Sequence, residues 1–174
     1  IFGQPDFTIS PAFLWAATAF QTLFSPWAAD AYDAARFAGV VFTAIGLTAC
    51  GFAGFNFLGR HHGRSVVLIL IGSIGLLPIA HFLNPMSAVF AAFGLILCGF
   101  SLARRRVIIA ILLLCGGWVL LSLSSGYLLT AAMIFLALAL SFHSTWQSKR
   151  YLLTLIGTIV VSLPLLILYP LVLS

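Results

Sequence analysis

Long apolar stretches separated by short polar breaks make up the chain from residue 34 onward. The hydrocarbon core of a bilayer is about 30 Å thick, and a helix that rises about 1.5 Å per residue needs about 20 apolar residues to cross it. Six stretches reach that length or come close, and the breaks between them are too short for a soluble domain. The pattern predicts an all-α, polytopic transmembrane helix bundle with spans at 34–58, 65–83, 86–103, 107–124, 127–143 and 152–173.

The first 33 residues contain one further apolar stretch, from Pro11 to Phe24, which is too short to cross a membrane. Acidic residues follow it. We expect a short amphipathic helix that lies in the outer interface, with Trp15 and Phe20 facing lipid. The chain is therefore divided into an outer interfacial segment, 1–33, and a helical bundle, 34–174.

The composition of the chain also indicates an integral membrane protein. The chain is 63% hydrophobic and 6% charged, with a mean hydropathy of +1.20, whereas soluble domains carry about a quarter charged residues. A cytosolic enzyme, a disordered tail and a nucleic-acid partner are excluded on this ground. The three cysteines lie in apolar stretches without CxxC spacing, which indicates buried thiols. The chain starts at Ile1 without a signal-peptide pattern, and we expect it to be a piece of a longer protein.

Basic residues occur in every second break between the apolar stretches. Because consecutive spans alternate in direction, these breaks fall on one side, which the positive-inside rule makes cytoplasmic. Asp30, Asp33 and Arg36 fall on the outer side. We expect an integral protein of a bacterial inner membrane, with cytoplasmic loops that contact anionic lipid headgroups. The basic residues in these loops are Arg60, Arg64, Arg104, Arg105, Arg106, Lys149 and Arg150.

Polar side chains gather at the predicted outer ends of the spans, where Asp6, Arg36, His81 and Asn84 are the candidate substrate-binding residues. Span ends on one side of a bundle converge, so these residues could line one outer cavity. Arg36 would bind a lipid phosphate, and Asp6 could accept a proton. The alternatives are headgroup-level positions for the charged residues and a packing role for His81. No Asp, Glu, Lys or Arg lies at mid-span, which argues against a proton pump or a charge-coupled transporter.

Several short motifs follow one another along the chain in a recognisable order. An interfacial segment opens at Phe7 to Pro11 with Trp15 downstream, and Ala34-Ala35-Arg36 starts a span. An aromatic-Leu-Asn-Pro turn follows at Phe82 to Pro85, and Ser162-Leu163-Pro164 lies in the last span. In order and in predicted side, these motifs resemble the polytopic glycosyltransferases of the GT-C type, particularly the protein O-mannosyltransferase and lipid A aminoarabinose transferase group.

The resemblance implies transfer of a sugar from a polyprenyl-phosphate donor to an acceptor at the outer face, with Arg36 on the donor phosphate. It is compatible with a divalent metal, although the residues themselves indicate no cofactor and no metal ligands. The family's catalytic Asp would lie upstream of Ile1, so the catalytic base stays unassigned.

Some positions depart from the family pattern. Thr8 and Ile9 stand where the family has Glu and Lys, Met86 follows the outer turn in place of the expected Asp, and Ser125 replaces a Lys. These departures favour an alternative, a noncatalytic membrane subunit that packs against a protein partner. A small-molecule transporter is a third reading.

Overall fold

The computed structural model describes residues 11–24, 30–59, 61–73, 84–143, 146 and 148–173, with the backbone alone at 31–32 and 165–173. Throughout this part of the chain the regular structure is α-helical, which confirms the all-α prediction. Two helices are long and apolar enough to cross a membrane, α2 over Asp33–Leu58 and α6, which indicates a membrane protein. The helices are α1 (Pro11–Phe24), α2 (Ala31–Leu58), α3 (His62–Gly72), α5 (Met86–Leu102), α6 (Val107–Ser125), α7 (Tyr127–Ser141) and α8 (Lys149–Leu173).

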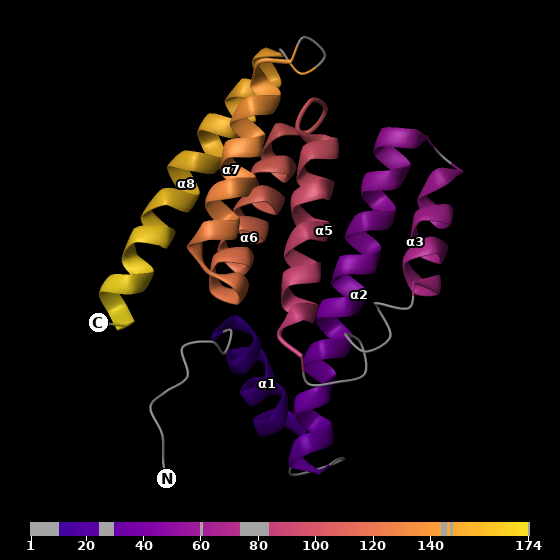
Figure 1. The fold of residues 1–174 in the computed structure, drawn as a ribbon, viewed down its shortest axis with the longest axis vertical. Coiled ribbons are helices and arrows are strands. Elements are labelled where there is room, and N and C mark those ends of the chain that lie inside the picture. Colours follow the sequence, from indigo (N-terminus) through magenta and orange to yellow (C-terminus); the bar gives the residue numbers. More distant parts are fainter. Residues whose placement is uncertain are drawn as a thin grey trace.

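Six of these helices stand side by side, and successive ones run in opposite directions (Figure 1). The starts of α2, α5 and α7 therefore lie at one end of the bundle, and the starts of α3, α6 and α8 at the other. Within this row α2 and α5 are spatial neighbours that run parallel. Helix α1 lies at the lower end in this view, against α2.

Proline and glycine set several helix ends. Pro11 occupies the first position of α1, where a missing N–H leaves no helical hydrogen bond unmade. Gly126 alone separates α6 from α7, and its φ of +85° allows a reversal that residues with a Cβ rarely adopt. Its N–H donates to the Ser122 carbonyl at 3.1 Å, which closes the last turn of α6.

Helix α3 differs from the span predicted at 65–83. It begins at His62 and ends at Gly72, and Ser73 has extended backbone angles, so one uninterrupted helix over 65–83 is wrong. Glycine and serine favour helices less than the preceding Leu and Ile residues, which explains an end at this point. Gly63, expected in a basic loop, is instead a buried residue of the first turn of α3. Residues 74–83 lie outside the described residues.

Helix α1 agrees with the predicted interfacial helix at both ends. Its Phe13 and Ala17 are buried against Ala38 of α2 and Ala88 of α5, so α1 packs where these two helices lie together. Trp15 is exposed, as expected. Phe20 does not simply face lipid, because it is half-buried beside that cluster and stacks on Phe24 with a centroid separation of 5.9 Å.

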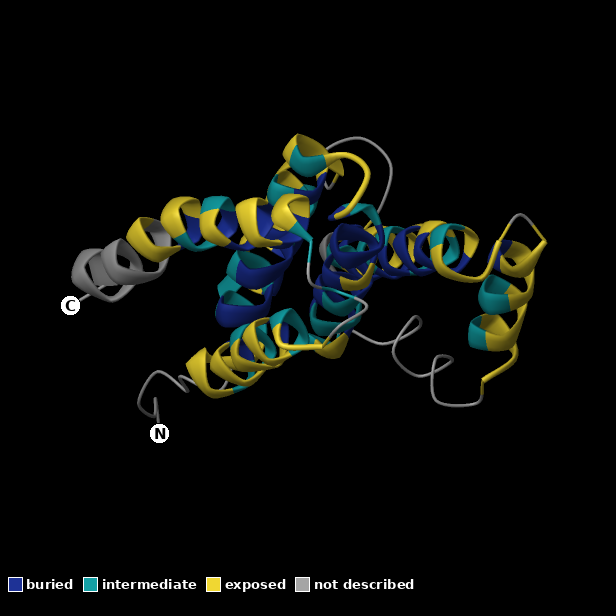
Figure 2. Ribbon diagram, turned by 90° about the horizontal axis from the view of Figure 1, so that it is seen from above, coloured by how far each residue is buried: buried dark blue, intermediate teal, exposed yellow. Residues whose placement is uncertain are grey.

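Small residues fill the contacts between helices, whereas many large apolar residues are exposed. Figure 2 shows that several helices have both buried and exposed residues along their length. Half of the buried apolar side chains are alanine, while Leu128 and Phe135 of α7 are 88% and 74% exposed. Gly94 of α5 meets Gly46 of α2 so closely that a Cβ on Gly94 would lie 2.8 Å from the Gly46 carbonyl oxygen. Close backbone contact at small residues is typical of helices that pack within lipid, where large apolar side chains need no burial.

The largest core cluster joins α5, α6, α7 and α8. Trp118 of α6 is fully buried at its centre. The Tyr151 hydroxyl of α8 donates to the Ala137 carbonyl of α7 at 2.7 Å. The Thr154 hydroxyl is shared between the Arg150 carbonyl of its own helix, at 2.8 Å, and the Ala103 carbonyl after α5, at 3.2 Å. These bonds hold α8 against the rest of the bundle at its basic end.

Candidate functional site

Charge is segregated between the two ends of the bundle. The starts of α3 and α8 and the turn between α5 and α6 carry the basic residues at one end (Figure 1). Asp30, Asp33 and Arg36 lie at the opposite end, near the start of α2. The chain therefore places the predicted cytoplasmic basic groups together, and separates them from the candidate binding residues. The basic residues that the structure describes at the basic end are Arg64, Arg104, Arg105, Arg106, Lys149 and Arg150.

Arg36 lies in the second turn of α2 and forms an ion pair within the helix. Its Nη1 is 3.6 Å from Oδ1 of Asp33, and the two side chains are 42% and 60% exposed. An exposed pair at this spacing contributes about 0–1 kcal/mol in water. The pair with Asp33 therefore adds little to the stability of the protein.

Asn84 has a structural role at the start of α5. Its Oδ1 accepts a hydrogen bond from the Met86 N–H at 3.0 Å, and its carbonyl accepts from the Ser87 hydroxyl at 2.9 Å. These bonds satisfy groups at a helix start that have no partner within the helix. The side-chain oxygen of Asn84 is thus already engaged by the protein.

Arg36 and Asn84 are brought to the same end of the bundle by the parallel pairing of α2 and α5. Gly46 faces Gly94 in this pair, and Ala38 and Ala88 belong to one cluster nearer the helix starts. The other two candidate residues, Asp6 and His81, lie outside the described residues. The structure therefore describes two of the four predicted binding residues, Arg36 and Asn84, and it places both at the end of the bundle where α1 lies.

The described residues do not fit a divalent metal. They contain no group of three or more His, Cys, Asp or Glu side chains that could hold an ion. Asp30 and Asp33 are their only carboxylates, and Asp33 faces Arg36. Hard cations such as Mg²⁺ and Ca²⁺ need several oxygen ligands, so no step of a mechanism is assigned to a metal here.

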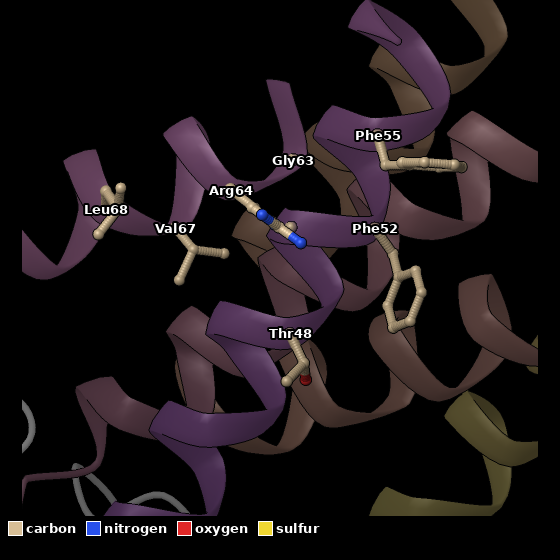
Figure 3. A pocket seen from close by; sticks show the side chains of 8 residues that line it. Thr48, Phe52, Phe55, Gly63, Arg64, Val67 and Leu68 are labelled. Atoms are coloured by element: carbon tan, nitrogen blue, oxygen red, sulfur yellow. The ribbon is translucent and has the colours of Figure 1, made fainter. Parts of the chain in front are cut away.

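A groove between α2 and α3 was not foreseen from the sequence. It has a volume of about 650 Å³ and reaches from Arg64, in the first turn of α3, to Thr48, in the middle of α2 (Figure 3). Gly51 and Gly63 lie at its base, and Arg64 is the one charged side chain among the described residues that line it. The glycines Gly51 and Gly54 on α2 were the available signal, because small residues on an apolar helix favour close helix contact.

Comparisons of the chain with protein-family models, with curated protein sequences and with solved structures give no match. The resemblance to GT-C glycosyltransferases therefore depends on the sequence motifs alone.

Proposed function

We propose that the chain is the membrane-embedded part of a GT-C type glycosyltransferase, which transfers a sugar from a polyprenyl-phosphate donor to an acceptor at the outer face of a bacterial inner membrane. The observation that carries the proposal is the arrangement of one bundle end. Arg36 and the start of α5 lie there beside the interfacial helix α1, and the basic residues lie at the other end. A lipid-linked donor needs such a place, where a cation meets the headgroup region next to lipid.

The proposed topology has six crossings, with the basic end in the cytoplasm and α1 on the outer surface. Charge segregation supports this orientation, and the exposed Leu, Ile and Phe side chains support lipid on the outside of the bundle.

Cysteine accessibility tests the topology. In a variant with Cys50, Cys98 and Cys115 replaced by alanine, we expect Asp33→Cys to react with a membrane-impermeant maleimide in intact cells. Arg105→Cys should react only after the membrane is opened, because it lies in the turn at the basic end. Labelling of Arg105→Cys in intact cells, or of both positions from one side, would contradict the proposed topology.

Within this topology, Arg36 would stabilise the charge that develops on the departing phosphate. An acid oxygen near lipid would deprotonate the acceptor, and Asp6 is the candidate for this role. The exposed ion pair with Asp33 keeps the Arg36 guanidinium at the membrane surface without burying it.

A transfer assay with the full-length protein in membranes tests this role. We expect Arg36→Ala to lower the rate of transfer from a polyprenyl-phosphate sugar about tenfold, the loss typical of one hydrogen bond to a charged group. Arg36→Lys should retain part of the activity, because the charge remains but the bidentate geometry is lost. Asp6→Ala examines the second candidate in the same assay.

Arg105→Ala is the matched control, since it removes an exposed arginine from the opposite end of the bundle. Equal effects of Arg36→Ala and Arg105→Ala would mean that Arg36 has no specific role. A well-folded wild-type protein that transfers no sugar from any polyprenyl-phosphate donor would overturn the transferase proposal.

A noncatalytic membrane subunit is the second candidate. The engagement of Asn84 in the start of α5 and of Arg36 with Asp33 supports it, because both side chains have structural partners within the chain. In that case purification in mild detergent should recover a partner protein in fixed proportion, and the Arg36→Ala variant should retain that partner.

A further inference from the structure

The α2–α3 groove is an open surface groove above a close contact between the two helices. A Cβ on Gly63 would lie 2.8 Å from the Gly51 carbonyl oxygen, and Val67 of α3 packs so closely over Gly51 that a Cβ there would lie 2.8 Å from its side chain. Apolar side chains of both helices line the groove, Phe52 and Phe55 on α2 and Val67 and Leu68 on α3 (Figure 3).

Arg64 supplies a cation at the upper end of this groove. Its guanidinium extends from the first turn of α3 toward α2, over the space between the helices (Figure 3). The three acidic residues of the chain all lie at or before Asp33. No hydrogen bond or ion pair joins Arg64 to another of the described residues. The start of α3 is the positive end of the helix dipole, which adds to the positive potential around Arg64. The first turn of α3 contains no acidic residue that would reduce this potential.

The groove is long enough for the first part of an acyl chain. Leu68 lies one turn beyond Arg64, about 6 Å along α3, and Thr48 lies two turns before Phe55, about 10 Å along α2. The lining is apolar below Arg64, because the Thr48 hydroxyl donates to the carbonyls of Ala44 and Ile45 within its own helix. A phosphate at Arg64 would thus be followed by a channel for an acyl chain.

We propose that the α2–α3 groove binds an anionic two-chain phospholipid, with its phosphate on Arg64 and one acyl chain between Phe52 and Leu68. Charge complementarity favours this occupant, because Arg64 is an exposed cation beside an otherwise uncharged lining. Basic sites between membrane helices recognise anionic headgroups in this way. The proposal is independent of sugar transfer, because Arg64 lies at the opposite end of the bundle from Arg36.

Fluorescence quenching in vesicles tests the site. Leu68→Trp places a reporter in the wall of the groove, and the signal of the four native tryptophans is measured in the wild type and subtracted. In mixed vesicles we expect brominated phosphatidylglycerol to quench the reporter with a relative binding constant about fivefold above that of brominated phosphatidylcholine. A preference of this size corresponds to the attraction between an anionic lipid and one cation at the membrane surface.

Adding Arg64→Ala should abolish this preference, and adding Arg106→Ala should leave it unchanged. Arg106 is an exposed arginine at the same end that does not line the groove. Equal quenching by both lipids, or equal effects of the two arginine variants, would overturn the proposal, because the attraction would then belong to the basic surface as a whole.

Two competitors separate the sources of phosphate. Excess unlabelled phosphatidylglycerol should relieve the quenching, whereas inorganic phosphate should not, because it lacks the acyl chain. Displacement by a polyprenyl phosphate but not by phosphatidylglycerol would overturn the proposal in favour of a donor-lipid site.

Native mass spectrometry gives a second readout without the tryptophan reporter. The wild type and Arg106→Ala should retain a bound phosphatidylglycerol that Arg64→Ala loses, and equal retention by all three would contradict the site.

Discussion

Replacing Gly94 by leucine is expected to force α2 and α5 apart and to lower the free energy of unfolding by about 3 kcal/mol. The reason is backbone contact. A Cβ at Gly94 would lie 2.8 Å from the carbonyl oxygen and 3.1 Å from the Cα of Gly46. A flexible side chain could turn away from such a clash, but a helix backbone has to move as a whole. The loss should appear even though leucine favours a helix more than glycine does.

Gly116→Leu is the matched control for this prediction. Gly116 lies within α6, and no other part of the structure comes within 4 Å of a Cβ placed there. The same substitution should therefore be neutral or slightly stabilising. Unfolding of the purified protein by sodium dodecyl sulfate in mixed micelles, followed by tryptophan fluorescence, compares the two variants. Equal shifts of the midpoint would show that α2 and α5 do not depend on the contact at Gly46.

Truncating Trp118 to alanine is expected to lower the free energy of unfolding by about 4 kcal/mol. Trp118 is fully buried in the cluster that joins α5, α6, α7 and α8. Lipid is as apolar as this core, so burial itself gives little driving force in a membrane. The cavity left by the indole nevertheless removes packing contacts that no neighbouring side chain replaces.

Trp118→Phe separates packing from hydrogen bonding. The Trp118 Nε1 is buried and has no hydrogen-bond partner among the described residues. Replacement by phenylalanine removes this unsatisfied donor and most of the ring remains, so the expected loss is under about 1 kcal/mol. Trp15→Ala, at a position 56% exposed, should change stability by less than about 0.5 kcal/mol. A Trp118→Phe loss as large as that of Trp118→Ala would contradict this account, because it would require a partner for the indole N–H.

The positions of the helices could largely be predicted from the sequence, because they depend on local features. Pro11 and the break after Phe24 bound α1, and Gly126 bounds α6 and α7, as predicted within one or two residues. The end of α3 at Gly72 was missed because hydropathy continues beyond it. An apolar stretch long enough to cross a membrane does not by itself show that the backbone is helical along its whole length.

The pairing of helices could not be predicted, because it depends on contacts between distant positions. Nothing in the local pattern around Gly46 or Gly94 identifies the other as its partner. The buried place of Gly63 was missed for the same reason, since a glycine between two arginine-containing turns is typical of a loop. Small residues indicate that a helix face makes a close contact, but they do not identify the helix that packs against it.

The role of the candidate binding residues stays a prediction, and their contacts were not predicted although they are local. Arg36 lies near the start of α2. Its ion pair with Asp33 follows from a spacing of three residues in a helix, which the sequence already contained. The bond from the Met86 N–H to Asn84 is likewise local, and an Asn before Pro is typical of such a turn.

The parallel pairing of α2 with α5 also sets the order of events during biosynthesis. When α2 leaves the ribosome, the helix that will cover Gly46 has not been translated, and α3 must first be made and turned back. At about 5–20 residues per second this interval lasts several seconds. Throughout it the small-residue face of α2 is open to the insertion machinery or to lipid, so the nascent chain is most vulnerable to quality-control proteases before α5 arrives.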